Sequence, residues 1–172
     1  MRGNFAAAAE QYRKAANLAF TEPVAMRLYE ALQRSGQQAA ARQVLQIFLD
    51  QNPRSVPALT IAAQLYLQAG DWPRAIRTYE ALRSRLGDRD AVMLNNLAWA
   101  YSESGDHQRA IPLARKAWAL EKNNPATADT LGWLLFKSGA NKAEGLMLLE
   151  RAARGAPTDA DIARHLAAAR KG

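Results

Sequence analysis

The feature that most constrains the fold of this chain is a glycine that returns about every 34 residues. Successive members of this set are separated by 33, 34, 35 and 34 residues, and they are Gly3, Gly36, Gly70, Gly105 and Gly139. An alanine follows five residues after each of the first four, at Ala8, Ala41, Ala75 and Ala110. A period of this length fits two helices with tight turns, so the sequence predicts an array of helical repeats.

Each mark in the repeat has a physical reason. A glycine adopts a positive φ without a Cβ clash, so it ends one helix and lets the chain reverse into the next. A small alanine lets two helices approach closely, and a bulkier residue nearby fills the space beside it. Within one helix, Leu94, Leu97, Ala98 and Tyr101 follow the series i, i+3, i+4 and i+7 that is typical of an amphipathic helix.

These marks predict ten helices and no strand. Their expected ranges are 4–19, 22–35, 38–51, 56–69, 72–86, 90–104, 107–121, 126–138, 142–155 and 159–170. We expect one continuous array over 1–172, with a half repeat at 1–21, complete repeats at 22–55, 56–89, 90–124 and 125–159, and a terminal helix at 160–172. The turn of the last complete repeat is one residue longer, because Gly145 follows Gly139 by six residues rather than five. The first and last helices each lack the partner helix of their repeat, so we expect the chain to be a fragment of a larger protein.

The series Leu97-Ala98…Tyr101…Gly105…Ala110…Ala117 resembles the signature of tetratricopeptide (TPR) repeats. Matching series in phase with it are Ala62-Ala63…Tyr66…Gly70…Ala75…Tyr79 and Leu131-Gly132…Gly139…Ala152…Pro157. The resemblance implies an all-α fold, a right-handed superhelix of antiparallel helix pairs in which the first helix of each pair lines a concave groove. It also implies that the groove binds another protein or a peptide.

A narrower resemblance concerns the segments Leu94–Trp99 and Thr127–Trp133. They are similar to the C-terminal repeats of bacterial TPR lipoproteins that accompany exosortase (PEP-CTERM) sorting and exopolysaccharide systems. This resemblance implies an exported, membrane-anchored or periplasmic parent protein, whose partners would be components of protein sorting or polysaccharide export. A cytoplasmic location is the alternative. The chain itself contains no apolar run of about 20 residues that could span a membrane, and targeting signals are expected on a longer parent protein.

In TPR pairs the fifth, ninth and thirteenth positions of a repeat project into the groove. By the resemblance, the candidate partner-binding residues are Met26, Glu30, Arg34, Thr60, Gln64, Gln68, Asn95, Trp99, Glu103, Asp129, Trp133 and Lys137. Trp99 and Trp133 stand one repeat apart, so they are expected on adjacent helices with axes about 8–10 Å apart. They form either an amphipathic binding patch or part of the core between repeats.

Nothing in the sequence points to an enzyme, a cofactor or a metal site. The chain has no cysteine, which excludes disulfides and thiolate ligands, and it lacks the common nucleotide-binding and hydrolase motifs. Of the two histidines, His107 is expected to pack near a turn or to face solvent, and His165 is expected to be exposed on the terminal helix if no further repeat follows. The pairs Asp88 with Asp90 and Asp159 with Asp161 are expected to cap helices, as is Asp71.

The leading hypothesis is therefore a scaffold that binds a peptide or a partner helix. One alternative is a surface that binds a polyanion, either nucleic acid or acidic polysaccharide, because the net charge is +7. The basic residues are dispersed and the groove shows no regular base-reading code, which argues against nucleic acid. The other alternative is a structural spacer, with end-to-end homodimers formed through apolar terminal faces that include Ala163 and Leu166.

Overall fold

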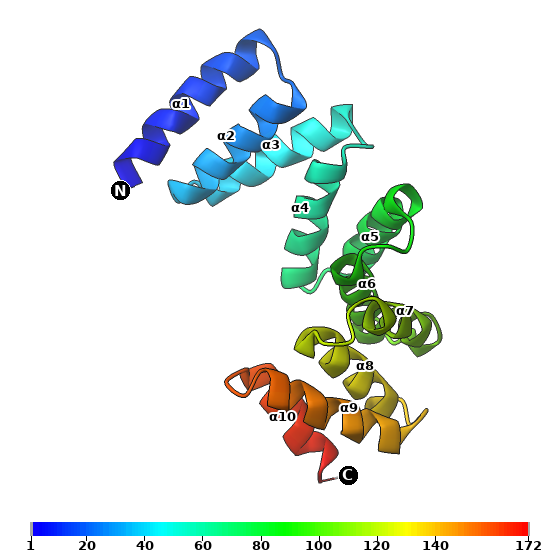
Figure 1. The fold of residues 1–172 in the computed structure, drawn as a ribbon. Coiled ribbons are helices and arrows are strands. Elements are labelled where there is room, and N and C mark those ends of the chain that lie inside the picture. Colours follow the sequence, from blue (N-terminus) through cyan, green and yellow to red (C-terminus); the bar gives the residue numbers. More distant parts are fainter. Residues whose placement is uncertain (1, 172) are drawn as a thin grey trace. The chain divides into compact units, whose positions relative to one another are not determined.

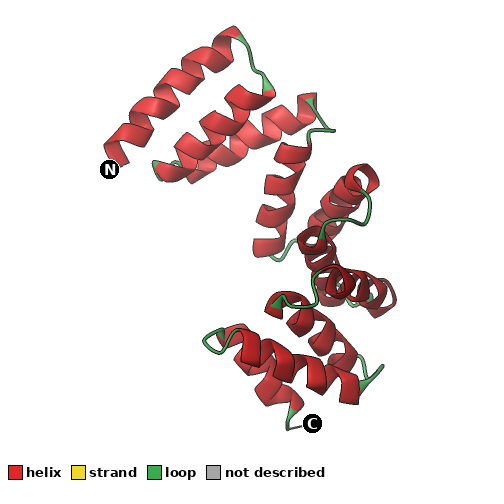
Figure 2. Cartoon of the chain, in the orientation of Figure 1, coloured by secondary structure: helices red, strands yellow, loops and turns green. Residues whose placement is uncertain are grey.

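The structure is a computed structural model that describes residues 2–171. These residues form helices joined by short loops, without a strand in the described part of the chain (Figures 1 and 2). The helices are α1 (Arg2–Leu18), α2 (Glu22–Arg34), α3 (Gln38–Gln51), α4 (Val56–Gln68), α5 (Trp72–Leu86), α6 (Ala91–Glu103), α7 (His107–Leu120), α8 (Pro125–Lys137), α9 (Lys142–Gly155) and α10 (Ala160–Ala169). The predicted all-α repeat fold is confirmed, and every helix bound agrees with its prediction to within two residues.

The described chain divides into two compact units, and the boundary between them in the sequence falls within α4. The first extends to Ala62 and contains α1, α2, α3 and the start of α4. Here α2 packs against both α1 and α3, in the blue and cyan part of Figure 1. Their shared core contains Ala9 from α1, Leu28 and Leu32 from α2, and Ala41 from α3. The expectation of one continuous array across both units stays a prediction.

The second unit begins at Ala63 and contains the rest of α4 with α5 to α10. From α5 onward each helix packs against the next, and α8 also contacts α6 and α10. Successive helices therefore form antiparallel pairs, and the first helices of neighbouring pairs lie against one another. Its core is built mainly of alanines and leucines, and the leucines with almost no exposed surface include Leu94, Leu97, Leu131, Leu134 and Leu149.

Four of the five glycines that define the period make turns, whereas Gly3 lies within α1. Gly36, Gly70, Gly105 and Gly139 all have positive φ, and the four values lie between 68° and 87°. In the turn after α4, the amide of Asp71 donates to the carbonyl of Tyr66, five residues back. After α8 the equivalent bond runs from Asn141 to Leu135, six residues back, so the extra residue is accommodated by a wider loop.

Side-chain caps fix where most helices of the second unit begin. Asp71, Asp90 and Asp159 each accept a hydrogen bond from a backbone amide in the first turn of the helix that follows, as predicted. The prediction is wrong for Asp88 and Asp161. Asp88 accepts from Arg83 and Lys116, and Asp161 pairs with Arg164 at 2.9 Å, because both aspartates lie outside the N-cap position and face basic side chains.

A pair of glycines lets α8 and α9 approach closely. A Cβ atom built on Gly132 would lie 2.9 Å from the carbonyl oxygen of Gly145, and one on Gly145 would lie 2.8 Å from that of Gly132. Real Cβ contacts are longer than this, so no other residue fits at either position without moving a helix. This close approach matters for function because it fixes the position of α8, which carries Asp129 and Trp133.

Candidate partner-binding groove

The predicted groove residues of α6 and α8 lie on helices that contact each other in the second unit. The ammonium of Lys137 lies 3.5 Å from a carboxylate oxygen of Glu103. These two residues occupy the thirteenth position of successive repeats, so equivalent positions on the two helices meet. The ninth positions hold Trp99 and Trp133, and both indoles are only partly buried.

A third aromatic ring completes this arrangement. The imidazole of His165, on α10, stacks on Trp133 with ring centroids 4.5 Å apart and planes 10° from parallel. The same imidazole lies 5.9 Å from the ring of Trp99, at 35°. Asp129 accepts a hydrogen bond from it, with Nδ1 and Oδ2 separated by 2.8 Å. We call these four residues, which come from α6, α8 and α10, the tryptophan–histidine cluster.

The expectation that His165 is exposed is wrong. Only 6% of the residue is exposed, because α10 packs against α8 and α9 and carries the imidazole over the two indoles. A carboxylate can only accept a hydrogen bond. Nδ1 of His165 therefore carries a hydrogen and donates the hydrogen bond to Asp129. His107, by contrast, is partly buried at the start of α7, and its Nδ1 has no hydrogen-bond partner.

Two oxygen acceptors in this region have no donor. Asp129 is 8% exposed, and its Oδ1 is buried without a hydrogen-bond partner. The Oδ1 of Asn95, at the fifth position of α6, is also buried and unpartnered. A buried acceptor without a donor typically costs about 1–3 kcal/mol, more when it is charged. The groove therefore contains unused hydrogen-bonding capacity beside two indoles.

The groove positions predicted on α2 and α4 are less distinctive. Glu30 lies 3.4 Å from Arg34, whose guanidinium covers the ring of Phe5 at 5.0 Å. Met26 on the same helix is partly buried. On α4, the hydroxyl of Thr60 donates to the carbonyl of Val56 at 2.9 Å. Gln64 and Gln68 are exposed, and all six stay predictions as binding residues.

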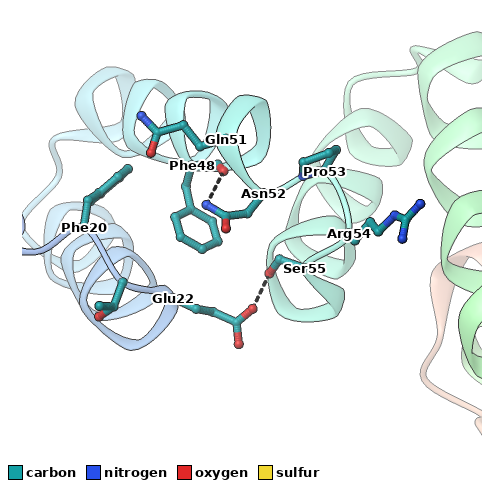
Figure 3. Close-up of a pocket in the computed structure, with 9 residues that line it drawn as sticks. Phe20, Glu22, Phe48, Gln51, Asn52, Pro53, Arg54 and Ser55 are labelled. Carbon is teal, nitrogen blue, oxygen red and sulfur yellow. Dashed lines mark hydrogen bonds between the residues drawn. The ribbon is translucent and has the colours of Figure 1, made fainter.

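The structure also contains a cavity that the sequence did not predict (Figure 3). It has a volume of about 420 Å³ and lies in the first unit, where the loop before α2 meets the loop before α4. The rings of Phe20 and Phe48 meet edge to face at 5.5 Å, and Ser55 donates to Glu22 at 2.6 Å across the opening. Figure 3 shows Arg54 pointing away from that carboxylate. The one sequence signal was Phe20, an aromatic residue outside any predicted helix.

The described residues hold neither a candidate metal site nor a candidate membrane span. Residues 2–171 contain no group of three or more histidine, aspartate or glutamate side chains placed to hold a metal ion. None of the helices in this range is long and apolar enough to cross a membrane. The clustered polar side chains that the structure does show are those of the groove and of the ion pairs between helices.

The fold and the site define a helical repeat protein in which two tryptophans, Trp99 and Trp133, lie on first helices that contact each other. Residues 58–123 match the family model of the tetratricopeptide repeat. This match identifies TPR repeats at residues 58–123, and the structural neighbours share the fold. TPR proteins generally mediate protein–protein interactions and bind peptides. A search of the curated proteins found no significant match.

Several solved structures share the fold at low sequence identity. The structure titled "MamA MSR-1 C2" has a TM-score of 0.72 and 18% identity, with 89% of this chain and 87% of that chain covered. A thermophilic TPR protein of Thermus thermophilus has a TM-score of 0.64 and 19% identity, with 99% and 92% covered. The first TPR domain of Spaghetti (RPAP3), bound to the HSP90 peptide SRMEEVD, has a TM-score of 0.59 and 19% identity, with 67% and 90% covered.

Proposed function

We propose that the second unit is a protein-interaction module that binds an extended peptide or a partner helix over α6 and α8. The observation that carries the proposal is the pair of partly buried indoles, Trp99 and Trp133, beside the unpartnered acceptors of Asn95 and Asp129. Tryptophan is enriched at binding hot spots because one rigid side chain offers both a large apolar surface and a hydrogen-bond donor. Acceptors without donors supply the polar contacts that would orient a ligand.

The rigidity of the helices supports the same proposal. Trp133 stands on α8, which is fixed by its close approach to α9, and both α6 and α8 carry fully buried leucines. A side chain held in place before binding loses little conformational entropy when the partner arrives. The groove is therefore suited to a partner that contributes most of the flexibility, such as a peptide.

An acidic peptide tail is not the expected ligand. The TPR subgroup that grips a peptide's terminal carboxylate uses lysine, asparagine and arginine at fixed positions, where this chain has Thr60, Gln64, Ala126 and Thr130. Asn96 matches one of those positions, but its amide donates to the hydroxyl of Tyr79 at 3.1 Å. The carboxylate of Asp129 would also repel an anionic ligand.

The test is a selection from a phage-displayed library of random peptides, followed by affinity measurement on purified variants. Trp99→Ala and Trp133→Ala should each weaken the selected peptide by about 30-fold, the equivalent of about 2 kcal/mol at a binding hot spot. Trp72→Ala is the matched control, since Trp72 is also partly buried but begins α5 outside the predicted groove. Circular dichroism must show unchanged helix content in all three variants.

Two outcomes of the selection would reject the proposal. If Trp72→Ala weakens binding as much as the groove variants do, the binding surface lies elsewhere. If the intact chain selects no peptide at all, the structural-spacer hypothesis is favoured instead. A parent protein of the exosortase or exopolysaccharide systems stays a prediction from the resemblance, and it bears on the natural partner rather than on the groove.

A further inference from the structure

The chemistry of the groove indicates what kind of side chain it recognises. Asp129 is nine-tenths buried, and one of its carboxylate oxygens is bonded to His165 while the other has no donor. The unpartnered oxygen of Asn95 belongs to the neighbouring helix. Each of these oxygens can only accept a hydrogen bond, so a group that satisfies them must present hydrogen-bond donors.

The surrounding rings narrow the choice to a cation. Indole faces attract cations more strongly than the faces of tyrosine or phenylalanine do, and a guanidinium can also stack flat on them. The six predicted groove positions of α6 and α8 carry two carboxylates and one ammonium. The ammonium of Lys137 is paired with the carboxylate of Glu103, so these two charges offset each other. The carboxylate of Asp129 is the remaining charge among these six positions, and it is negative. The chain as a whole has a net charge of +7, so the negative charge at these positions is opposite in sign to the net charge of the protein.

His165 already makes the contacts that such a ligand would make. Its ring stacks on Trp133 and its Nδ1 donates to Asp129. An imidazole offers only this one donor on that side, which explains why the second carboxylate oxygen remains unsatisfied. A guanidinium carries five N–H donors in a planar fork, so it could bind both carboxylate oxygens at once and still reach a neighbouring acceptor.

We propose that Trp99, Asp129 and Trp133 form a cage for an arginine side chain of the partner, and that His165 occupies this cage in the free protein. The proposal rests on the proposed function and specifies the chemistry of the ligand. The imidazole of His165 is bonded to Oδ2 of Asp129 and stacks on Trp133, so the partner's arginine must displace it. The apparent affinity is lowered by the fraction of molecules in which the cage is filled.

The experiment uses three peptides of the form acetyl-Gly-Gly-X-Gly-Gly-amide, with X as arginine, lysine or glutamate. Binding is followed in the full chain through the NMR signals of the four indole N–H groups, of which Trp72 and Trp118 are internal controls. The arginine peptide should shift the signals of Trp99 and Trp133 and leave the controls unchanged. It should bind His165→Ala about tenfold more tightly than the unmodified chain. The lysine peptide should bind more weakly, because an ammonium cannot form the bidentate contact, and the glutamate peptide should not bind.

Asp129→Asn provides the counterpart, since it keeps the size of the side chain and removes the charge. In a chain that also carries His165→Ala, Asp129→Asn should lower the affinity for the arginine peptide by about tenfold. If His165→Ala loses helix content by circular dichroism, His165→Gln replaces it, because glutamine keeps a donor but cannot stack as an aromatic ring. The arginine peptide should then bind His165→Gln more tightly than the unmodified chain.

The inference is overturned if the arginine and glutamate peptides give the same shifts, or if Asp129→Asn leaves the arginine peptide's affinity unchanged. It is also overturned if a library-selected peptide needs Trp99 and Trp133 but contains no basic residue. In that last case the groove still binds a peptide and only its chemistry is different. Failure of the selection itself would instead remove the proposed function.

Discussion

Replacing Gly132 by alanine adds a single methyl group at the closest approach of α8 and α9. In an exposed helix the same change stabilises, because alanine has a helix propensity about 1 kcal/mol more favourable than glycine. In this chain the new Cβ would lie 2.9 Å from the carbonyl oxygen of Gly145 and 3.0 Å from both the amide nitrogen and the Cγ of Leu149. Two of these three atoms are backbone atoms, which cannot rotate out of the way.

The helices must therefore separate, and this disturbs a tightly packed interface. Overpacking a core by one methyl group typically costs about 1–3 kcal/mol, and contact with backbone places this site in the upper part of the range. After subtraction of the propensity gain, we expect Gly132→Ala to lower the free energy of unfolding by about 1–2 kcal/mol. For a chain of this size the midpoint of thermal unfolding should fall by about 2–8 °C.

Urea unfolding followed by circular dichroism at 222 nm measures the effect, with equal slopes required before free energies are compared. The control is Arg77, an exposed residue in the middle of α5. The free energy of unfolding of Arg77→Ala should exceed that of Arg77→Gly by about 1 kcal/mol. A Gly132→Ala variant as stable as the unmodified chain, or more stable, would show that the two helices do not approach as closely as described.

Three further predictions concern charge and association. The pKa of Asp88 is held well below its usual value, first by the hydrogen bond from Arg83 and then by that from Lys116. Such a group contributes stability above its unfolded pKa and loses it as the pH falls through its folded pKa. The deficit of Asp88→Asn should therefore be under about 1 kcal/mol near neutral pH, should begin to shrink only below the unfolded pKa of about 4, and should be lost only as the pH approaches the much lower folded pKa. A deficit that grows on acidification would contradict this sign. The apolar terminal face predicts weak end-to-end dimers, so light scattering over a concentration series should show self-association that Ala163→Glu reduces; a strict monomer throughout would count against it. The dispersed basic residues predict little retention on heparin at about 0.15 M salt, and tight binding with a steep salt dependence would favour the polyanion hypothesis.

The repeat made the fold predictable because each of its marks is a local physical requirement. A glycine at Gly70 or Gly105 must end a helix where the chain needs positive φ, and Asp71 or Asp159 must start one where amides lack partners. These requirements depend on neighbours a few residues away. The register of ten helices could therefore be assigned from the sequence, as could the longer turn before Asn141.

The site was only half predictable, because it depends on contacts across three repeats. The spacing of Trp99 and Trp133 placed both on neighbouring first helices, and that follows from the period alone. The position of His165 does not, since its contact with Asp129 spans 36 residues and depends on how α10 settles against α8. A histidine on the last helix offers no local signal that it will be buried against two indoles.

The central claim is that a partner binds over α6 and α8, and photo-crosslinking tests it most directly. A library-selected peptide carrying p-benzoylphenylalanine would be irradiated with the full chain, and the crosslinked residues would be identified by mass spectrometry. We predict crosslinks within Ala91–Glu103 and Pro125–Lys137, lost when excess unlabelled peptide is added. Crosslinks confined to α7 and α9, the second helices of the same repeats, would contradict the claim.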